Sequence, residues 1–341
     1  MDAINTFAIL FMGQIYTQTI DSATSAPKVI GLSLDQTKEP SVAVCLAAFN
    51  GMRYLKQQTE SIFAQTGVNL TLFVSVDSSD DGTEEWVANL QAADSRVVLL
   101  PCGQKFGGAA VNFFRMLREI DFSQFDYISF ADQDDIWQPK KLQRAVECLR
   151  AQDADGYSSD VIAFWESGRS QYIKKSYPQE KWDYLFESAG PGCTFVITRG
   201  LAMHIQNVLR DRLSQSLNVG LHDWFTYAFA RANGYKWVID DYASLMYRQH
   251  EGNQVGVNVG FAAVVWRAKQ VLSGWGLNQA RLIAQLVGAD QQRFVNNWCH
   301  GGRLAMLGLG LQAPRCRRRP RDKVLFALSC LALSVVGWKS V

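Results

Sequence analysis

Three carboxylates follow directly on an apolar run in the segment FADQDDIWQPKKL, residues 130–142. They are Asp132, Asp134 and Asp135. Carboxylates placed this closely repel one another, and a divalent cation removes the repulsion. Asp oxygens suit Mg²⁺ or Mn²⁺, and Mg²⁺ is usually held by one or two carboxylates together with substrate phosphates. The pattern therefore predicts a site for a metal ion and a diphosphate. The alternative is a solvated acidic turn in which Asp135 caps the next helix.

Polar side chains also follow two earlier apolar runs. Asn50 comes after SVAVCLAAF (41–49), and Asp77 comes after LTLFVSV (70–76). If these runs are parallel strands, their carboxyl ends lie at one edge of a sheet, where α/β proteins bind ligands. We therefore expect Asn50, Asp77 and Asp132 to converge at that edge.

The elements that must position these residues alternate in type along the chain. Apolar runs rich in β-branched residues alternate with segments of helical periodicity, which predicts an α/β fold with a mainly parallel sheet. The expected strands of the first half cover residues 41–49, 70–76, 96–101 and 125–131. The second half adds an expected strand over 193–199, a helix over 223–232, one or two strands over 236–250 and helices over most of 261–312.

Composition excludes several classes of protein. Of the 341 residues, 48% are hydrophobic and 19% are charged, which allows a sizeable core. A net charge of +2 argues against a general nucleic-acid binder. The seven Cys residues form no CxxC pair, which favours free thiols in a reducing compartment, and we expect a cytoplasmic protein. The apolar run 7–16 has no basic leader and is too short to cross a bilayer.

The C-terminal tail combines a basic run with an apolar one. Residues 315–323 read RCRRRPRDK, and residues 324–338 read VLFALSCLALSVVGW. A basic run beside an apolar helix suits the anionic inner face of the cytoplasmic membrane. The alternative is a helix that packs on its own domain, with its arginines in solvent. Both interpretations stay open from the sequence.

Three motifs occur in the order and approximate spacing of a known family: VAVCLAAFNGMRYLKQQTESIFAQT (42–66), VDSSDDGT (76–83) and FADQDDIWQPKKL (130–142). The chain resembles family 2 glycosyltransferases of the GT-A fold, and within them the bacterial rhamnosyltransferase-like enzymes. GPGCTFVITRGLA (190–202) and HDWFTYAFA (222–230) extend the resemblance into the second half, to about residue 256.

The resemblance implies a role for particular residues in binding a sugar nucleotide. Asp77 would bind the nucleobase, and Asp132 would contact the ribose. Asp134 would hold the metal ion, Mg²⁺ or Mn²⁺, that bridges the diphosphate. Three residues of the first loop would frame the nucleotide, namely Ala47, Phe49 and Asn50. One departure concerns the base contact, because Val76 stands where the family often has a further aspartate.

Asp223 has two interpretations. Its position before an apolar helix makes it a good N-cap, whereas the resemblance implies that it is the general base. We place Gly192 and Trp224 in the loop region that meets donor and acceptor. For His250, which follows an expected strand, the alternatives are a third metal ligand, a diphosphate contact or a hydrogen bond within its loop.

The sequence thus predicts a metal-dependent inverting glycosyltransferase. Its donor would be a nucleotide sugar, with dTDP-rhamnose favoured by the resemblance, and its acceptor a hydroxyl of a surface polysaccharide or lipid-linked glycan. The alternatives are a nucleotidyltransferase and a degenerate, membrane-attached nucleotide-sugar-binding protein. The expected organisation is a flexible extension (1–40), the GT-A domain (41–256), a helical region (257–314) and the tail (315–341).

Overall fold

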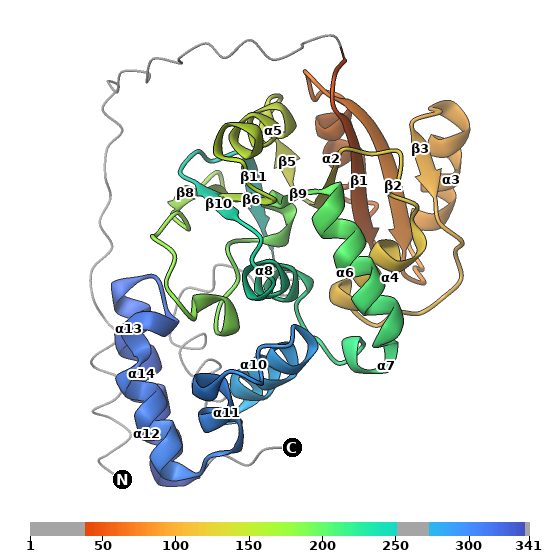
Figure 1. Ribbon diagram of the computed structural model, residues 1–341. Coiled ribbons are helices and arrows are strands. Elements are labelled where there is room, and N and C mark those ends of the chain that lie inside the picture. Colours follow the sequence, from red (N-terminus) through yellow and green to blue (C-terminus); the bar gives the residue numbers. More distant parts are fainter. Residues whose placement is uncertain (1–37, 251–272, 338–341) are drawn as a thin grey trace, which may run out of the picture.

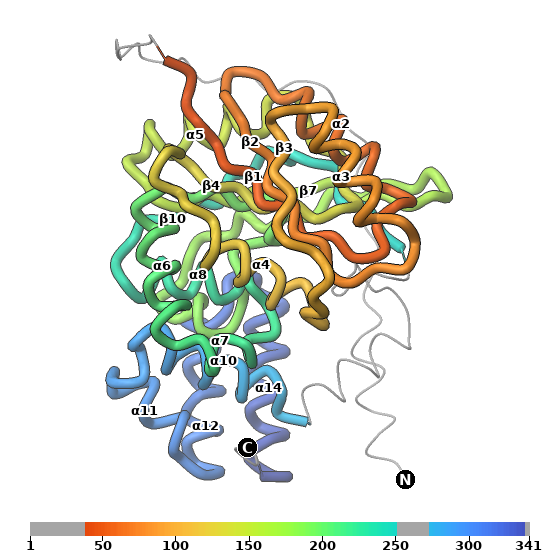
Figure 2. The backbone as a smooth tube through the Cα atoms, turned by 90° about the vertical axis from the view of Figure 1, so that its right-hand side faces the viewer, coloured from red at the N-terminus to blue at the C-terminus, as the bar shows by residue number. Residues whose placement is uncertain are grey.

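The computed structural model describes residues 38–250 and 273–337 (Figure 1). Almost all of the expected N-terminal extension (1–40), the boundary at 256 and the beginning of the expected helical region lie outside these residues. The described chain forms a layered α/β fold, with a group of C-terminal helices stacked at one end (Figures 1 and 2). The predicted fold class is confirmed.

A seven-stranded sheet with the order β10-β6-β9-β4-β1-β2-β3 forms the centre of the fold. Its strands are β1 (Ser41–Ala48), β2 (Asn69–Val76), β3 (Val97–Leu99), β4 (Tyr127–Asp132), β6 (Gly156–Ser159), β9 (Val196–Thr198) and β10 (Trp237–Asp240). The strands β1 to β4 run parallel to their neighbours in this group, as predicted. The short strand β9 is antiparallel to both β4 and β6, so the sheet is mixed.

The central strand β1 is buried on both faces, which explains its nearly continuous apolar sequence. Ala43 and Cys45 face one core, and Val42, Val44 and Leu46 face the other. The first core contains α4 (Ala109–Glu119), α6 (Arg199–Asp211) and α8 (His222–Ala232). The second core contains α2 (Leu55–Phe63), α3 (Thr83–Ala93) and α5 (Lys141–Gln152).

A smaller four-stranded sheet, which the sequence did not predict, lies next to the acidic segment. Its order is β5-β11-β7-β8, with β5 (Ile136–Trp137), β7 (Val161–Trp165), β8 (Ser170–Ile173) and β11 (Leu245–Gln249). Because β5 begins directly after Asp135, this aspartate caps no helix; α5 begins five residues later and has no side-chain cap. The capping alternative for Asp135 is therefore wrong.

The C-terminal helices form one packed group below the large sheet (Figure 2). They are α10 (Trp275–Leu286), α11 (Arg293–His300), α12 (Arg303–Leu311), α13 (Ala313–Cys316) and α14 (Pro320–Val336). The tail helix α14 packs mainly against α12 and α13, with Cys330 and Leu333 buried. Within residues 38–250 and 273–337, no helix is both long enough and apolar enough to cross a membrane.

Candidate active site

The strand register brings the expected ligand-binding residues to one edge of the large sheet. Ala47, near the end of β1, pairs with Ser75 of β2 on one side and with Asp132 of β4 on the other. The amide of Asp77 then donates to the carbonyl of Ala48 over 2.8 Å. Neighbouring strands lie about 4.8 Å apart, so Asp77 and Asp132 stand roughly two strand spacings apart, on either side of β1.

Carboxylates from two distant segments meet beside Asp132. Burial, and then the negative charges of Asp134 and Asp223, raise the pKa of Asp132 to about 7. Asp132 is therefore close enough to Asp134 and Asp223 to be affected by both charges, although 91 positions separate residues 132 and 223. A positive charge beside Asp132 would favour its ionised form.

Asp135 lies behind this group, away from solvent. One side-chain oxygen each from Asp132 and Asp135 and the thiol of Cys193 all lie within 4.8 Å of one another. Burial, followed by the charges of Asp134 and Asp132, raises the pKa of Asp135 well above its ordinary value. Its Oδ1 accepts the backbone amide of Arg248 over 3.1 Å, whereas its buried Oδ2 has no hydrogen-bond partner.

A buried lysine stands under the acidic group. Lys141, at the start of α5, is fully buried, with its Nζ 3.3 Å from the Ser129 hydroxyl and 3.7 Å from the centre of the Trp137 ring. Burial lowers the pKa of Lys141 to about 7, while the Asp135 carboxylate favours its charged form. No local pattern distinguishes Lys141 from the surface lysines, because its burial depends on tertiary contacts, among them those with Ser129 and Trp137.

His250 contacts the second aspartate of the Asp132–Asp134 pair. Its Nε2 lies 2.6 Å from Asp134 Oδ2, and its ring centre lies 5.1 Å from that of Tyr54. His250 is thus hydrogen-bonded to Asp134, the residue for which the resemblance implies a metal ion.

Arg248 fixes the turn that carries Asp134. Its Nε donates to the Asp134 carbonyl over 2.7 Å, and its Nη2 donates to Gln57 Oε1 over 2.6 Å. The guanidinium lies between the rings of Tyr54 and Phe164, at 4.6 and 4.5 Å from their centres. Arg248 thus orients the acidic turn, a role that sequence inspection missed because these hydrogen-bond partners lie more than 100 residues away.

The Asp77 carboxylate holds the segment around Phe106 and Gly107 by hydrogen bonds. It accepts backbone amides from Ser78 (2.9 Å), Phe106 (2.8 Å) and Gly107 (2.9 Å). Asp77 is 5% exposed, so a nucleobase would have to approach a lone pair that these amides leave free.

The first loop is tied to the acidic segment through Gln133. The Gln133 side chain accepts the Phe49 amide (2.8 Å) and donates to the Phe49 carbonyl (2.9 Å). Asn50 adopts a left-handed φ of 45°, and its side chain accepts the Asp80 amide over 3.0 Å. Phe49 itself is 54% exposed, which leaves its ring available to a ligand.

Asp223 lies in the first turn of α8 but does not cap it. The N-cap position is Leu221, and no side chain provides a cap. Asp223 Oδ1 accepts the Trp224 amide over 2.7 Å. Burial raises the pKa of Asp223 to about 6, against the lowering effect of that amide, the Ser188 hydroxyl and the Lys175 ammonium. A carboxylate with this pKa is ionised at neutral pH and still accepts a proton readily.

The Gly192 backbone packs directly against His222 and Asp223. A Cβ on Gly192 would lie 2.4 Å from His222 Nε2 and 3.2 Å from Asp223 Cβ, so only glycine fits. His222 is stacked on Phe113 at 3.8 Å, and burial lowers its pKa to about 3. Trp224 is buried, and its indole donates to the Tyr184 carbonyl over 3.0 Å. Gly192 therefore borders Asp223, whereas Trp224 has a packing role.

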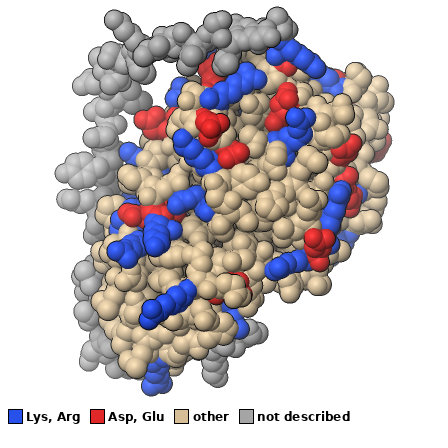
Figure 3. All heavy atoms as spheres, in the orientation of Figure 1, with Lys and Arg blue, Asp and Glu red and all other residues tan. Residues whose placement is uncertain are grey.

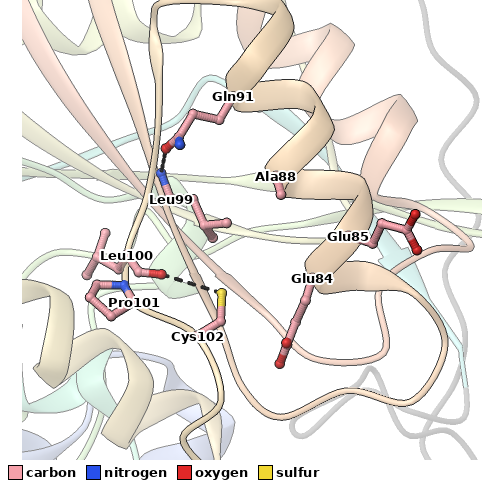
Figure 4. Close-up of a pocket in the computed structure, with 8 residues that line it drawn as sticks. All are labelled: Glu84, Glu85, Ala88, Gln91, Leu99, Leu100, Pro101 and Cys102. Carbon is pink, nitrogen blue, oxygen red and sulfur yellow. Dashed lines mark hydrogen bonds between the residues drawn. The ribbon is translucent and has the colours of Figure 1, made fainter.

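A separate hollow of about 470 Å³ lies between α3 and the segment that follows β3 (Figure 4). Glu84 and Cys102 are among its lining residues, and Gln91 on its wall accepts the Leu99 amide over 2.6 Å. Since β3 is the edge strand, three places from β4, this hollow is separate from the acidic group.

The residues at the sheet edge fit a hard divalent cation. Asp132 and Asp134 offer carboxylate oxygens, the ligands that Mn²⁺ and Mg²⁺ prefer, and His250 Nε2 lies 2.6 Å from Asp134 Oδ2. Burial and then the neighbouring negative charges raise the pKa of Asp132, and a bound cation would offset the effect of those charges.

Comparison with known proteins agrees with this geometry. The profile described as Glycosyl transferase family 2 matches residues 43–210. The dTDP-rhamnosyl transferase RfbG of Shigella flexneri is 38% identical over 284 residues, which cover 83% of this chain and 98% of the relative. The chain belongs to glycosyl transferase family 2. It is therefore a glycosyltransferase of the rhamnosyltransferase-like type, and the nucleotidyltransferase alternative does not hold.

Other relatives of this glycosyltransferase are more distant. A glucosyltransferase of Escherichia coli, UDP-Glc:alpha-D-GlcNAc-diphosphoundecaprenol beta-1,3-glucosyltransferase WfgD, is 28% identical over 46% of this chain and 59% of its own length. Among solved structures, S. aureus TarS 1-349 in complex with UDP has a TM-score of 0.52 at 14% identity, covering 86% of this chain and 81% of TarS. This structural likeness supports the fold only.

Proposed function

We propose that this glycosyltransferase moves a rhamnosyl group from dTDP-rhamnose to a hydroxyl of a surface-polysaccharide or lipid-linked glycan, with inversion at the anomeric carbon and with a divalent cation. The donor is inferred from the name of the 38% identical Shigella flexneri relative. The observation that carries the mechanism is the meeting of Asp132, Asp134 and Asp223 at the carboxyl edge of the sheet.

Asp134 and His250 would hold the cation, with Asp132 beside them. Their 2.6 Å contact and the turn fixed by Arg248 support this assignment. When bound, the cation would neutralise the negative charge that grows on the departing diphosphate. Asp77 is proposed to meet the nucleobase and Asp132 the ribose, with Ala47, Phe49 and Asn50 framing the nucleotide.

Asp223 is proposed as the general base. The acceptor hydroxyl must lose a proton as it attacks the anomeric carbon, and a partly buried carboxylate with a pKa of about 6 can take that proton at neutral pH. Direct attack opposite the leaving diphosphate inverts the anomeric centre. Asp223 Oδ1 is occupied by the Trp224 amide, so Oδ2 would accept the proton. Gly192 lies against this carboxylate and would border the acceptor.

We infer a peripheral contact with an anionic membrane surface through α12 and α14. Apolar side chains on the two helices are exposed, including Leu304 (82%), Leu311 (82%) and Val335 (69%). Exposed arginines accompany them, namely Arg303, Arg315, Arg319 and Arg321. In Figure 3 basic side chains stand on a largely uncharged surface at this end of the molecule. This combination fits lipid headgroups over an acyl layer.

Glutamate substitutions test the membrane contact without disturbing the packed tail. Leu304→Glu combined with Leu311→Glu is expected to lower co-sedimentation with phosphatidylglycerol-containing vesicles by at least about tenfold, because two charges would enter the lipid interface. Glutamates at exposed Leu213 and Leu217, near α7 (Leu213–Ser216), provide the matched control. Equal vesicle binding by both double variants would contradict the contact.

A panel of nucleotide sugars tests the proposed donor. We expect dTDP-rhamnose with Mn²⁺ to raise the melting temperature most and to be turned over slowly, and we expect a chelator to abolish both effects. UDP-glucose and GDP-mannose serve as comparisons. Stabilisation by another nucleotide sugar in preference to dTDP-rhamnose would contradict the donor assignment, and turnover unaffected by chelation would contradict metal dependence.

A further inference from the structure

The loop that follows η1 (Asp183–Leu185) reaches the proposed base. Its residue Ser188 donates from Oγ to the Gly190 carbonyl over 2.9 Å, and the Ser188 hydroxyl is near enough to the Asp223 carboxylate to lower the pKa of that group. Gly192, four residues after Ser188, begins η2 (Gly192–Thr194) and packs against His222 and Asp223. The position of residues 186–192, which we call the base loop, therefore affects the surroundings of Asp223.

The C-terminal tail holds the base loop by direct hydrogen bonds. Arg317 Nη1 donates to the Phe186 carbonyl over 2.9 Å. The Arg318 amide donates to Glu187 Oε1 over 2.6 Å, and Arg318 Nη2 donates to the Ser188 carbonyl. Just ahead of η1, the Trp182 amide donates to the Arg315 carbonyl over 2.8 Å. Three consecutive residues of the loop thus receive donors from two consecutive residues of the tail.

The Arg318 side chain is buried rather than exposed to solvent. Its side chain is 3% exposed, and its Nε lies 3.7 Å from Asp183 and 3.6 Å from Glu187. Asp183 is fully buried and also accepts the Tyr227 hydroxyl (2.9 Å) and Arg231 Nη1 (3.2 Å). Tyr227 and Arg231 belong to α8, the helix that carries Asp223. The Arg318 guanidinium therefore joins the base loop and α8 into one network.

We propose that Arg318 is a positioning residue for the transfer reaction: through the Ser188 carbonyl and the Asp183–Glu187 pair, it holds the base loop against Asp223. This inference rests on the proposed role of Asp223. The segment between α13 and α14 would then support the active site. The C-terminal helices would also connect the proposed membrane surface with the base loop. Arg318 is not among the residues proposed to hold the donor, so we expect donor binding to be independent of it.

Arg318→Lys tests the proposal, because it keeps the charge next to Asp183 and Glu187 but lacks the planar fork that also reaches Ser188. We expect kcat for transfer to fall about 10- to 100-fold, since small displacements of catalytic groups have effects of this size. The dissociation constant for dTDP with Mn²⁺ should stay within about twofold of the wild-type value. Arg150→Lys, at an exposed position of α5, is the matched control and should leave both quantities unchanged.

Ser188→Ala provides a second variant that leaves every ion pair of the tail intact. It should lower kcat by about tenfold with unchanged dTDP affinity, and its effect should be less than additive with that of Arg318→Lys. A kcat within twofold of wild type in Arg318→Lys, or losses that multiply independently in the double variant, would overturn the proposal. If Asp223→Asn itself kept full activity, the proposed base would fail instead, so the two failures are distinguishable.

Discussion

Replacing Asp223 with Asn is expected to lower the rate of sugar transfer by about 10²- to 10⁴-fold, the usual contribution of a positioned general base. The amide keeps the size of the carboxylate, and its oxygen can still accept the Trp224 amide at the start of α8. The fold and the dTDP affinity should therefore remain. The measurement is transfer of labelled rhamnose to an acceptor-bearing membrane fraction, with dTDP binding followed separately. Asp211→Asn, at the exposed end of α6, is the control.

The pH profile adds a second readout for Asp223. Burial raises its pKa to about 6, so the ionised form needed for catalysis is present above that pH and is lost below it. At saturating donor and metal, kcat/KM for the acceptor should fall about tenfold for each pH unit below 5. The residual rate of Asp223→Asn should lack this acidic limb. An unchanged limb in the variant would assign the base to another group, and an unfolded variant would favour a structural role.

Asp134→Asn is expected to lower transfer by at least about 100-fold, because a carboxylate at this position supplies charge for the cation that stabilises the leaving diphosphate. The amide is a weak ligand for a hard cation, and the contact with His250 would lose its charge. Initial rates measured over a range of Mn²⁺ concentrations should show a higher metal requirement in the variant. Glu147→Gln on the exposed face of α5 removes the same charge elsewhere and should have no effect. Full activity at low Mn²⁺ in Asp134→Asn would contradict the assignment.

The sheet edge could be predicted from sequence because it depends on local pattern. Strands β1, β2 and β4 are apolar on both faces and end at polar residues, and parallel connections bring such ends to one edge. The spacing of the apolar runs was therefore enough to predict that Asp132 lies at this edge. The pairing of Asp223 with this edge came from family resemblance, since 91 residues of mixed pattern separate the two aspartates.

The groups that support the site could not be predicted in this way. Arg248 reaches the Asp134 carbonyl from 114 residues away, and no local sequence pattern indicates that contact. Lys141 and Cys193 gain their positions from the burial of α5 and η2, which no local periodicity records. Such contacts depend on tertiary packing and become visible only when the fold is known.

The tail shows why a basic run is ambiguous. Six arginines and lysines between 315 and 323 suggested either a membrane surface or solvation. The structure divides them: Arg318 is buried and Arg317 is partly buried against the base loop, whereas Arg315, Arg319 and Arg321 are exposed. Burial of Arg318 depends on Asp183 and Glu187, which lie about 130 residues earlier. A deletion of the whole tail would therefore change more than membrane contact.

The most direct test of the metal and diphosphate site is calorimetric titration of the protein with dTDP, in the presence and absence of Mn²⁺. Asp132, Asp134 and His250 should bind the ion and the nucleotide cooperatively. We predict that Mn²⁺ tightens dTDP binding by at least about tenfold in the wild type and has no effect in Asp134→Asn. Equal dTDP affinity with and without Mn²⁺ in the wild-type protein would contradict the account.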